Sequence, residues 1–321
     1  MKAIVVSNYG SPDVLKCEEV EKPIAGDDQV LIKVRAASVN PLDRMMRGKP
    51  YVLRLMTGLR KPKDTRLGRD VAGQVEAVGR NVTRFKPGDA VFGTCRGAFA
   101  EYACASESKL ATKPDKVTFE QAASVPVAGL TALQGLRDKG QIRQGQKVLI
   151  NGAAGGVGTF AVQIAKSFGA EVTAVCSTGK VDMVLSIGAD RIIDYAREDF
   201  TKGEQRYDLI FDCAGTRSLL ALRRLLNPKG VYILVGAPAQ GRWIGPLARV
   251  LKTLVASWFG SEKLVLFLAQ IRCEDLTILG ELIEAGKVTP VIGKRYRLSE
   301  VAEAIRYLEE GHARGKVVIT V

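Results

Sequence analysis

A glycine-rich segment, N-G-A-A-G-G-V-G at residues 151–158, is the part of the chain best suited to chemistry. It follows an apolar run, K-V-L-I-N, and opens a stretch with helical periodicity. Glycines at such a strand-to-helix turn let backbone N–H groups approach a pyrophosphate at the helix N-terminus. In register with G-x-G-x-x-G, the three positions hold Ala153, Gly155 and Gly158. The spacing predicts a dinucleotide site, and a tight turn without a ligand is the alternative.

The end of the next apolar run indicates which dinucleotide is bound. E-V-T-A-V-C at 171–176 is followed by S-T-G-K at 177–180, and no carboxylate precedes Asp182. Sites selective for NAD place Asp or Glu there for the ribose 2′-hydroxyl, whereas hydroxyls with a lysine suit a 2′-phosphate. The pattern therefore favours NADP(H) over NAD(H). The alternative is that Lys180 lies on a solvated helix face.

Histidine and cysteine usage excludes several classes of site. The chain has a single histidine, His312, which excludes any metal site that needs two imidazoles and any mechanism that needs two imidazoles. Six scattered cysteines without a C-x-x-C motif are typical of reduced, buried thiols. The N-terminus has no signal-peptide pattern, and the longest uncharged stretch, residues 148–165, is interrupted by glycines and polar residues. We therefore expect a soluble, cytoplasmic protein.

The order of the predicted elements indicates an α/β fold in two domains, which 321 residues are enough to form. Residues 1–116 contain short apolar runs separated by glycine and proline, which predicts antiparallel strands in a barrel or sandwich. After Pro126, short apolar runs alternate with amphipathic ones, which predicts a parallel sheet covered by helices on both faces. We expect residues 262–310 to be mainly helical, and K-V-V-I-T-V to form a final strand.

Five motifs in this order resemble the medium-chain dehydrogenase/reductase superfamily, in its zinc-independent, zeta-crystallin-like quinone oxidoreductase branch. The resemblance covers essentially the whole chain. The motifs are A-A-S-V-N-P-L-D (36–43), L-G-R-D-V-A-G-Q-V-E-A-V-G (67–79), F-K-P-G-D-A-V-F-G (85–93), A-A-S-V-P-V-A-G-L-T-A-L-Q-G-L (122–136) and N-G-A-A-G-G-V-G (151–158).

The resemblance implies a particular domain organisation. A GroES-like β-barrel domain would span residues 1–122, and a doubly wound Rossmann domain that binds NADP(H) would span 123–261. A C-terminal segment, 262–321, would return to the first domain. The active site would lie in the cleft between the two domains. Relatives of this kind are often dimers, so we expect a homodimer.

Departures from the zinc-containing alcohol dehydrogenases narrow the chemistry. Where those enzymes carry G-H-E, this chain has Gly68-Arg69-Asp70, and their cysteine-rich lobe is absent. Without zinc, alcohol oxidation loses its Lewis acid. The resemblance thus implies metal-free, NADPH-dependent hydride transfer from nicotinamide C4 to a quinone or an α,β-unsaturated carbonyl. The alternatives are an enoyl-thioester reductase, or a nucleotide-binding protein that acts mainly through RNA, a membrane or a protein partner.

The resemblance and the residue types together give a set of expected cofactor contacts. The alternative for one of them, Tyr195, is a half-buried ring that only packs. Asn40, Thr131 and Gly236 would contact the nicotinamide and its ribose, Ala154, Gly155, Gly156 and Val157 the pyrophosphate, and Ser177, Thr178, Lys180 and Tyr195 the 2′-phosphate.

Three residues are candidates for the catalytic chemistry, because an enone reduced at its β-carbon leaves an enolate that needs a proton. Asn40 is a candidate to hydrogen-bond the developing oxyanion, and Asp43 or Tyr51 to belong to a proton path. Each also has a structural alternative. Asn40 with the following proline is a turn signal, Asp43 could cap a helix, and Tyr51 could pack against the barrel.

Two stretches of unusual composition lie outside these motifs. Residues 44–69 hold nine Lys or Arg against one acid, Asp64. This indicates a solvated surface, steering of an anionic ligand or, less favoured, binding of nucleic acid or an anionic membrane. Residues 243–271 are apolar, but charges break them into pieces too short to span a bilayer. Helical core, a cover for the substrate pocket, a dimer interface and a membrane contact are the alternatives there.

Overall fold

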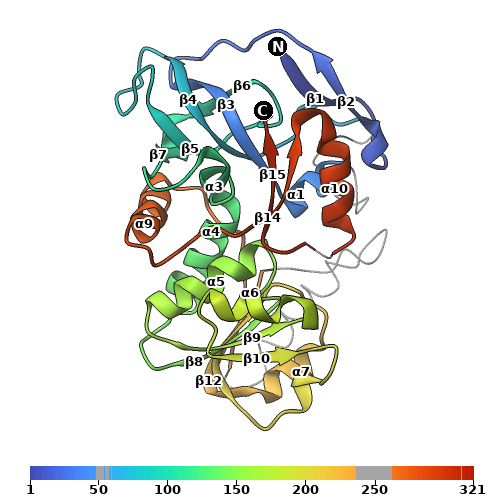
Figure 1. Cartoon of the computed structure of the whole chain (residues 1–321), viewed down its shortest axis with the longest axis vertical. Coiled ribbons are helices and arrows are strands. Elements are labelled where there is room, and N and C mark those ends of the chain that lie inside the picture. Colours follow the sequence, from blue (N-terminus) through green and yellow to red (C-terminus); the bar gives the residue numbers. More distant parts are fainter. Residues whose placement is uncertain (48–53, 55–57, 59, 236–261, 312) are drawn as a thin grey trace. The chain divides into compact units, whose positions relative to one another are not determined.

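The computed structural model describes residues 1–47, 54, 58, 60–235, 262–311 and 313–321, and the chain divides into two compact units (Figure 1). Each unit has a hydrophobic core of its own. The first unit comprises Met1–Val127, Gln270–Gly286 and Pro290–Val321, and the second comprises Ala128–Ala269 and Lys287–Thr289.

The first unit is built on a seven-stranded sheet with the order β14-β15-β3-β4-β5-β7, in which β6 also pairs with β3. A separate antiparallel pair is formed by β1 and β2. The strands are β1 Lys2–Val6, β2 Leu15–Glu19, β3 Gln29–Val39, β4 Asp70–Val78, β5 Ala90–Thr94, β6 Tyr102–Ser106, β7 Leu110–Thr112, β14 Ile292–Arg297 and β15 Lys316–Thr320.

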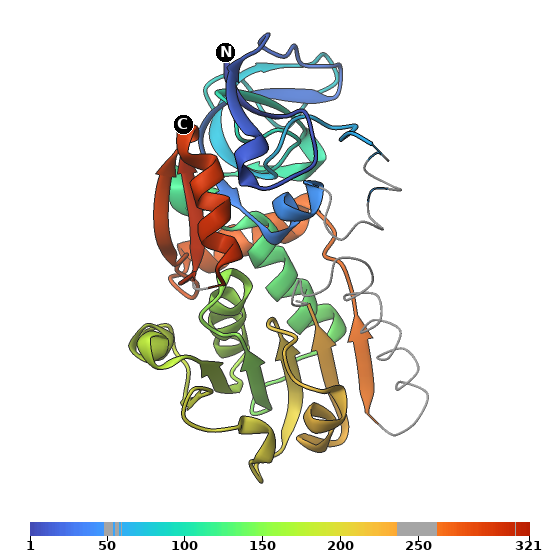
Figure 2. The same cartoon turned by 90° about the vertical axis from the view of Figure 1, so that its right-hand side faces the viewer.

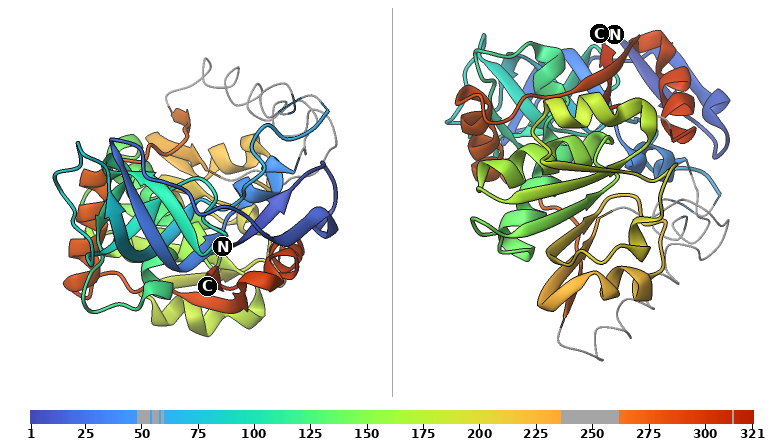
Figure 3. Two further views of the ribbon diagram at one scale, coloured as in Figure 1. Left: turned by 90° about the horizontal axis from the view of Figure 1, so that it is seen from above. Right: turned by 60° about the horizontal axis from the view of Figure 1, so that its bottom comes forward.

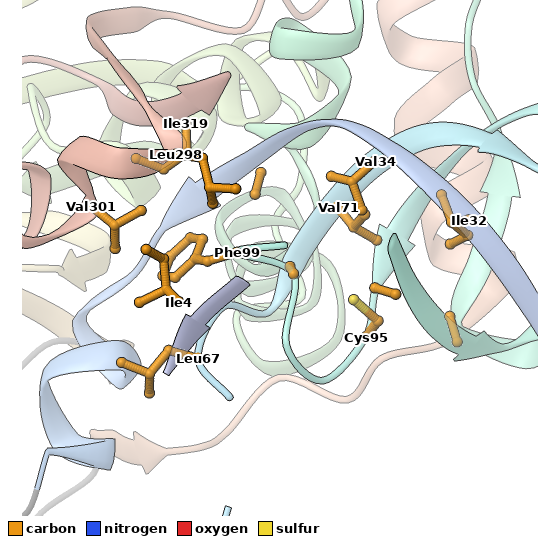
Figure 4. Packing of buried hydrophobic residues seen from close by; sticks show 14 of the residues in the cluster. Ile4, Ile32, Val34, Leu67, Val71, Cys95, Phe99, Leu298, Val301 and Ile319 are labelled. Atoms are coloured by element: carbon orange, nitrogen blue, oxygen red, sulfur yellow. The ribbon is translucent and has the colours of Figure 1, made fainter. Parts of the chain in front are cut away.

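Strand β3 is the organising strand of this unit, because it pairs with β15, β4 and β6. Its register with β4 shifts at two places, and such bulges bend a strand and increase its twist. Apolar side chains of the unit pack into one cluster, with Ile4, Phe99 and Val301 among its members (Figure 4). This sheet holds the end of β3 and the start of β4 in place.

Among the residues that the structure describes, the first unit has the α-helices α1 Pro41–Met46, α3 Phe119–Ala123, α9 Cys273–Glu284 and α10 Val301–Glu309. Thr118 begins α3 with a capping box, in which its hydroxyl accepts from Gln121 N–H and the Gln121 side chain accepts from Thr118 N–H. Helix α10 packs on β14 and β15, so the last part of the chain lies against the N-terminal strand β3 (Figure 3).

The second unit contains a six-stranded parallel sheet with the order β10-β9-β8-β11-β12-β13 (Figure 2). Numbered within the unit, this is the 3-2-1-4-5-6 order of the Rossmann fold. Central strands such as β8 are apolar on both faces because helices cover both sides. The strands are β8 Lys147–Asn151, β9 Glu171–Cys176, β10 Arg191–Asp194, β11 Tyr207–Asp212, β12 Leu226–Leu234 and β13 Lys263–Leu266.

The described helices of the second unit connect these strands. A helix, α4 Pro126–Gln134, runs across the division between the units in the chain and continues as a π-helical turn. The helices that follow are α5 Gly156–Ser167, α6 Val181–Ser186 and α7 Leu219–Arg224. The expected α/β fold, with a GroES-like domain and a Rossmann-like parallel sheet, is confirmed.

The domain boundaries and the expected helical content of residues 262–310 differ from the structure. The division falls after Val127 instead of residue 122. Residues 263–266 form β13 of the second unit, and 292–297 form β14, so the expectation of mainly helices there is wrong in part. Residues 287–289 also belong to the second unit, because the Gln163 side chain both donates to and accepts from the backbone of Thr289.

Candidate active site

The glycine-rich turn joins β8 to α5 and has the conformation that its glycines permit. Gly152 has a φ of +83°, which an L-residue rarely adopts. Its N–H and that of Ala153 donate to the carbonyl of Val175 in β9, at 3.2 and 3.1 Å. The turn is thereby fixed to the neighbouring strand, and Gly155 becomes the N-cap of α5.

The N-terminus of α5 offers unused donors. Its first helical bond runs from Thr159 N–H to Gly155 O, at 2.9 Å. Within the described part of the chain, the N–H groups of Gly156, Val157 and Gly158 have no acceptor. A Cβ on Gly158 would lie 2.2 Å from the carbonyl oxygen of Gly152, so this helix turn packs directly on the loop. These features fit a bound pyrophosphate.

The ends of β9 and β10 bring the expected 2′-phosphate residues together. The parallel register pairs Cys176 with Asp194, so Ser177 and Tyr195 follow at the same edge of the sheet. Tyr195 N–H donates to Cys176 O at 3.1 Å, and the Tyr195 ring is half exposed. Lys180 closes a turn by donating its N–H to Ser177 O at 2.9 Å.

An acid that the sequence analysis did not consider, Asp194, lies beside this turn. Thr178 donates its hydroxyl to the Asp194 carboxylate, and this hydrogen bond holds the pKa of Asp194 below its usual range. The carboxylate also accepts from Ala196 N–H at 3.0 Å and lies 3.4 Å from Arg197 Nε. The negative charge of Asp194, next to the expected phosphate site, is therefore offset by the positive charge of Arg197.

Asp212 is a second functional candidate that sequence reasoning missed. It ends β11, the strand next to β8 where the order of the sheet reverses, which is where dinucleotides bind in such folds. The buried carboxylate accepts from Asn151 Nδ2 at 2.8 Å, from Gly215 N–H at 2.8 Å and from the Tyr232 hydroxyl at 2.8 Å. A carboxylate at the end of a fully apolar strand, D-L-I-F-D, was the signal available in the sequence.

In the first unit, Asn40 belongs to a buried polar cluster. We name Ser38, Asn40, Asp70 and Lys316 the Asn40 cluster. Asn40 Nδ2 donates to Asp70 Oδ2 at 2.9 Å and to Ser38 O at 3.4 Å, and Asn40 Oδ1 accepts from Lys316 Nζ at 2.7 Å. Asp70 also accepts from the Ser38 hydroxyl at 2.7 Å and from Val127 N–H at 3.0 Å. A lysine at the start of an apolar strand, K-V-V-I-T, was the only sequence signal for Lys316.

Asp43 lies beside this cluster in the first turn of α1. Its Oδ2 accepts from Asn40 N–H at 2.7 Å, which caps the helix, whereas Oδ1 is buried and has no hydrogen-bond partner among the described residues. Burial raises the pKa of Asp43 to about 7, and the neighbouring Asp70 charge adds to this, while the Asn40 N–H and Lys316 oppose it. The carboxyl group can thus exchange a proton near neutral pH.

The remaining expected site residues divide into two groups. Ala154 is buried within the glycine-rich turn, and Thr131 lies half-buried in α4. Tyr51 and Gly236 lie outside the described residues, as does His312. The roles assigned to all of these residues from the sequence stay predictions.

The two stretches of unusual composition are described only in part. Within 44–69, Lys61, Lys63 and Arg66 are exposed, but Arg47 is buried and pairs with Glu309. Most of 243–271 lies outside the described residues. Among the helices that the structure describes, none is long and apolar enough to cross a membrane. The same residues contain no group of three or more His, Cys, Asp or Glu that could hold a metal ion.

The fold and these residues define a two-unit protein with a dinucleotide turn, and comparison with known proteins identifies its family. A family model described as "Alcohol dehydrogenase GroES-like domain" matches residues 26–115, and one described as "Zinc-binding dehydrogenase" matches 187–319. The chain belongs to the medium-chain dehydrogenase/reductase superfamily, in its quinone oxidoreductase branch.

Three relatives illustrate this membership. The mitochondrial NAD(P)H oxidoreductase of Bos taurus is 37% identical, over 100% of this chain and 89% of the relative. The chloroplastic NADPH-dependent alkenal/one oxidoreductase of Arabidopsis thaliana is 36% identical, over 99% and 79%. The solved quinone oxidoreductase of Coxiella burnetii has a TM-score of 0.84 and 34% identity, and the match covers 100% of this chain and 99% of that one.

Proposed function

We propose that this chain is an NADPH-dependent oxidoreductase that reduces quinones or α,β-unsaturated carbonyl compounds. The observation that carries the proposal is the edge of the second unit's sheet. There the open N–H groups of α5 follow β8, and Ser177, Lys180 and Tyr195 follow β9 and β10. Relatives named for NADPH, alkenals and quinones support the same reaction class.

Residues of the second unit would hold the cofactor. The α5 N-terminus provides N–H donors and the positive end of the helix dipole for the pyrophosphate. Lys180 provides positive charge, and Ser177 and Tyr195 provide hydroxyl groups, for the 2′-phosphate. NADPH, when bound, supplies a hydride to the substrate.

Reduction of an enone requires one proton besides the hydride, and Asp43 is our candidate to hold it. Its pKa of about 7 leaves the carboxyl group partly protonated at neutral pH. Oδ1 is the oxygen without a described partner, so it is the oxygen from which a proton could leave. Hydride transfer to a quinone leaves a hydroquinone anion, which can take the one proton it needs from water, so quinone reduction does not require Asp43.

We further propose a homodimer that works without a metal ion in the cytoplasm. No described strand pairs with the outer edge of β13, and Leu268, just after it, is fully exposed. An open apolar strand edge invites pairing with a second copy. Sedimentation of the purified protein tests the homodimer, since a monomer at micromolar concentration would contradict it.

Nucleic acid and anionic membranes are less favoured as partners.

Parallel fluorescence titrations with NADPH and NADH, followed by turnover, test the function. We expect tight binding of NADPH and weaker binding of NADH. We expect turnover of a quinone or an enal, with an enoyl thioester as the third substrate in the panel. Equal binding of both cofactors would contradict the 2′-phosphate assignment, and binding of neither would contradict the proposed function.

A further inference from the structure

Lys316 and Asp70 form a buried ion pair that the proposed reaction does not itself use. Their charged groups lie 3.3 Å apart, and the side chains are 4% and 0% exposed. Such a pair is costly to desolvate, and apolar residues of similar size often serve stability as well or better. The next residues of β15, Val317, Val318 and Ile319, show that an apolar side chain suits this strand. Stability alone therefore gives no reason for a charged pair here.

The pair contacts both ends of the Asn40 side-chain amide. Lys316 Nζ needs an acceptor and meets Oδ1 at 2.7 Å, while Asp70 Oδ2 needs a donor and meets Nδ2 at 2.9 Å. Turning the amide over would place Nδ2 against the ammonium group and Oδ1 against the carboxylate. Because both contacts would become repulsive, the two charges fix the orientation of the amide.

The strand registers place these charges where they act. Val317 of β15 pairs with Val39 of β3, so Lys316 comes next to Asn40 at the end of that ladder. Ser38 pairs with Asp70 at the start of β4. Lys316 also donates to Val39 O at 3.3 Å, so its three donors are used by Val39, Asn40 and Asp70.

We propose that Lys316 and Asp70 are positioning residues for Asn40, which hold its amide so that it meets the cofactor as a hydrogen-bond acceptor. Both Nδ2 hydrogens are committed, to Asp70 and Ser38, so the amide has no donor left for an oxyanion. The second lone pair of Oδ1 remains, and it suits an N–H of the nicotinamide carboxamide or an O–H of the ribose. The inference rests on the proposed NADPH-dependent function, together with the expectation from the family resemblance that Asn40 contacts the nicotinamide and its ribose.

The test is the double variant Lys316→Met/Asp70→Asn, which removes both charges without leaving either one unpaired. An amide at position 70 offers a donor or an acceptor equally, so Asn40 loses its fixed orientation. The matched control is Lys22→Met/Glu76→Gln, which removes an exposed ion pair from the same unit. Circular dichroism and a thermal melt establish that both variants are folded.

Three measurements are made. Hydrogen exchange of the Asn40 side-chain amide, assigned by its absence in Asn40→Leu, should be slow in the wild type and at least tenfold faster in the double variant. The Kd for NADPH should rise about tenfold, equivalent to about 1.4 kcal/mol. KM for NADPH should rise with it while kcat changes little, because the lost interaction binds ground and transition states alike. A merely structural role would instead reduce the amount of active enzyme and hence kcat.

The outcomes separate the two proposals. If the wild type binds NADPH and turns over substrate, and the double variant matches the control in exchange, Kd and KM, the positioning role is overturned and the function stands. If the wild type binds neither cofactor, the proposed function fails and the acceptor role fails with it. If the double variant does not fold, hydrogen exchange of the wild-type protein alone tests the positioning role. Exchange of its Asn40 amide as fast as that of Asn81, which is on the surface, would overturn the positioning role.

Discussion

The hydroxyl of Thr178 donates to the carboxylate of Asp194, and this hydrogen bond joins the turn after β9 to the end of β10. The single proton of the hydroxyl is used in this bond. Arg197 Nε lies 3.4 Å from the same carboxylate oxygen, Oδ2. A 2′-phosphate at this edge must therefore find its donors mainly on Ser177, Lys180 and Tyr195, and Thr178 shapes the turn that presents them.

Lys180→Met should weaken binding of NADPH by about tenfold or more and leave binding of NADH nearly unchanged. A charge-assisted hydrogen bond to a phosphate contributes about 1.5–3 kcal/mol. NADH lacks the 2′-phosphate and has nothing for this lysine to bind. Fluorescence titration measures both affinities, and Lys202→Met is a control on an exposed lysine of the same unit. Equal losses for the two cofactors would contradict the assignment.

Gly158→Ala should destabilise the second unit by about 1–3 kcal/mol, because overpacking costs that much. The added Cβ would meet Gly152 O at 2.2 Å and Ala153 Cα at 2.7 Å, which are backbone atoms that cannot turn aside. The forced movement of the loop should also weaken binding of both NADPH and NADH. Urea denaturation and titration measure the two effects. Gly203→Ala is the control, since its nearest neighbour is Phe200 O at 3.5 Å and we expect little change there.

Because of the buried Asp43 carboxyl group, the free energy of unfolding should decrease as pH rises from about 4 to about 7. Burial raises the pKa of Asp43 to about 7 from the ordinary value of 3.8, so in this range the folded state keeps a proton that the unfolded state has released. Each pKa unit corresponds to roughly 1.4 kcal/mol. Asp43→Asn does not titrate, so the variant should gain a few kcal/mol relative to the wild type between pH 4 and 8. Denaturation at several pH values measures this, and a difference independent of pH would contradict it.

Loss of the Asp43 proton should affect the turnover of enones and of quinones differently. Enone turnover by the wild type should fall above about pH 7, where the carboxyl group loses its proton. Asp43→Asn should lose most enone turnover and keep quinone turnover, because the hydroquinone anion left by hydride transfer can be protonated by water. Steady-state rates over pH 5–9 check this with the folded variant. Parallel losses for both substrates would exclude Asp43 as a specific proton donor.

Asp212→Ala should destabilise the second unit by about 3 kcal/mol or more. The substitution removes the acceptor of hydrogen bonds from Asn151, Gly215 and Tyr232 in a buried place, and unsatisfied buried donors each cost about 1–3 kcal/mol. Tyr232→Phe removes one of these bonds and should cost about 1 kcal/mol. Urea denaturation of both variants gives the comparison. Equal and small effects would show that Asp212 does not organise this edge of the sheet.

Chelation should leave quinone reduction unchanged. The proposed reaction uses the hydride donor and protein groups, and it needs no Lewis acid to polarise an alcohol. Activity after dialysis against EDTA and metal analysis of the purified protein provide the measurement. Loss of activity that zinc restores would contradict the metal-free reaction.

The glycine-rich turn and the strands around it could be predicted because their signals are local. The apolar run of β8, the glycines after it and the hydroxyl–lysine turn after β9 each lie within a short segment. Parallel pairing then brings the ends of β8, β9 and β10 to one edge of the sheet. Ser177, Thr178 and Lys180 are predicted from this local pattern and Tyr195 from the family resemblance, and the pairing of β9 with β10 brings the residues after both strands to one edge.

The Asn40 cluster could not be predicted in this way, because its members meet only through long-range pairing. Ser38, Asp70 and Lys316 come from three strands whose registers no local pattern specifies. Strand β14 was missed for a related reason. Its I-G-K-R-Y-R sequence is charged and mostly exposed, and it is a strand because β15 pairs with it.

The pairing of β15 with β3 also sets an order in which the chain can fold during synthesis. Residues 316–320 pair with strand β3, residues 29–39, so the sheet of the first unit cannot be completed until residues 316–320 have left the ribosome. Residues 128–269, which make up nearly all of the second unit, are synthesised earlier and can fold first. Until residues 316–320 are synthesised, the edge of β3 has no β15 to cover it, so the nascent N-terminal part depends on protection from aggregation during that time.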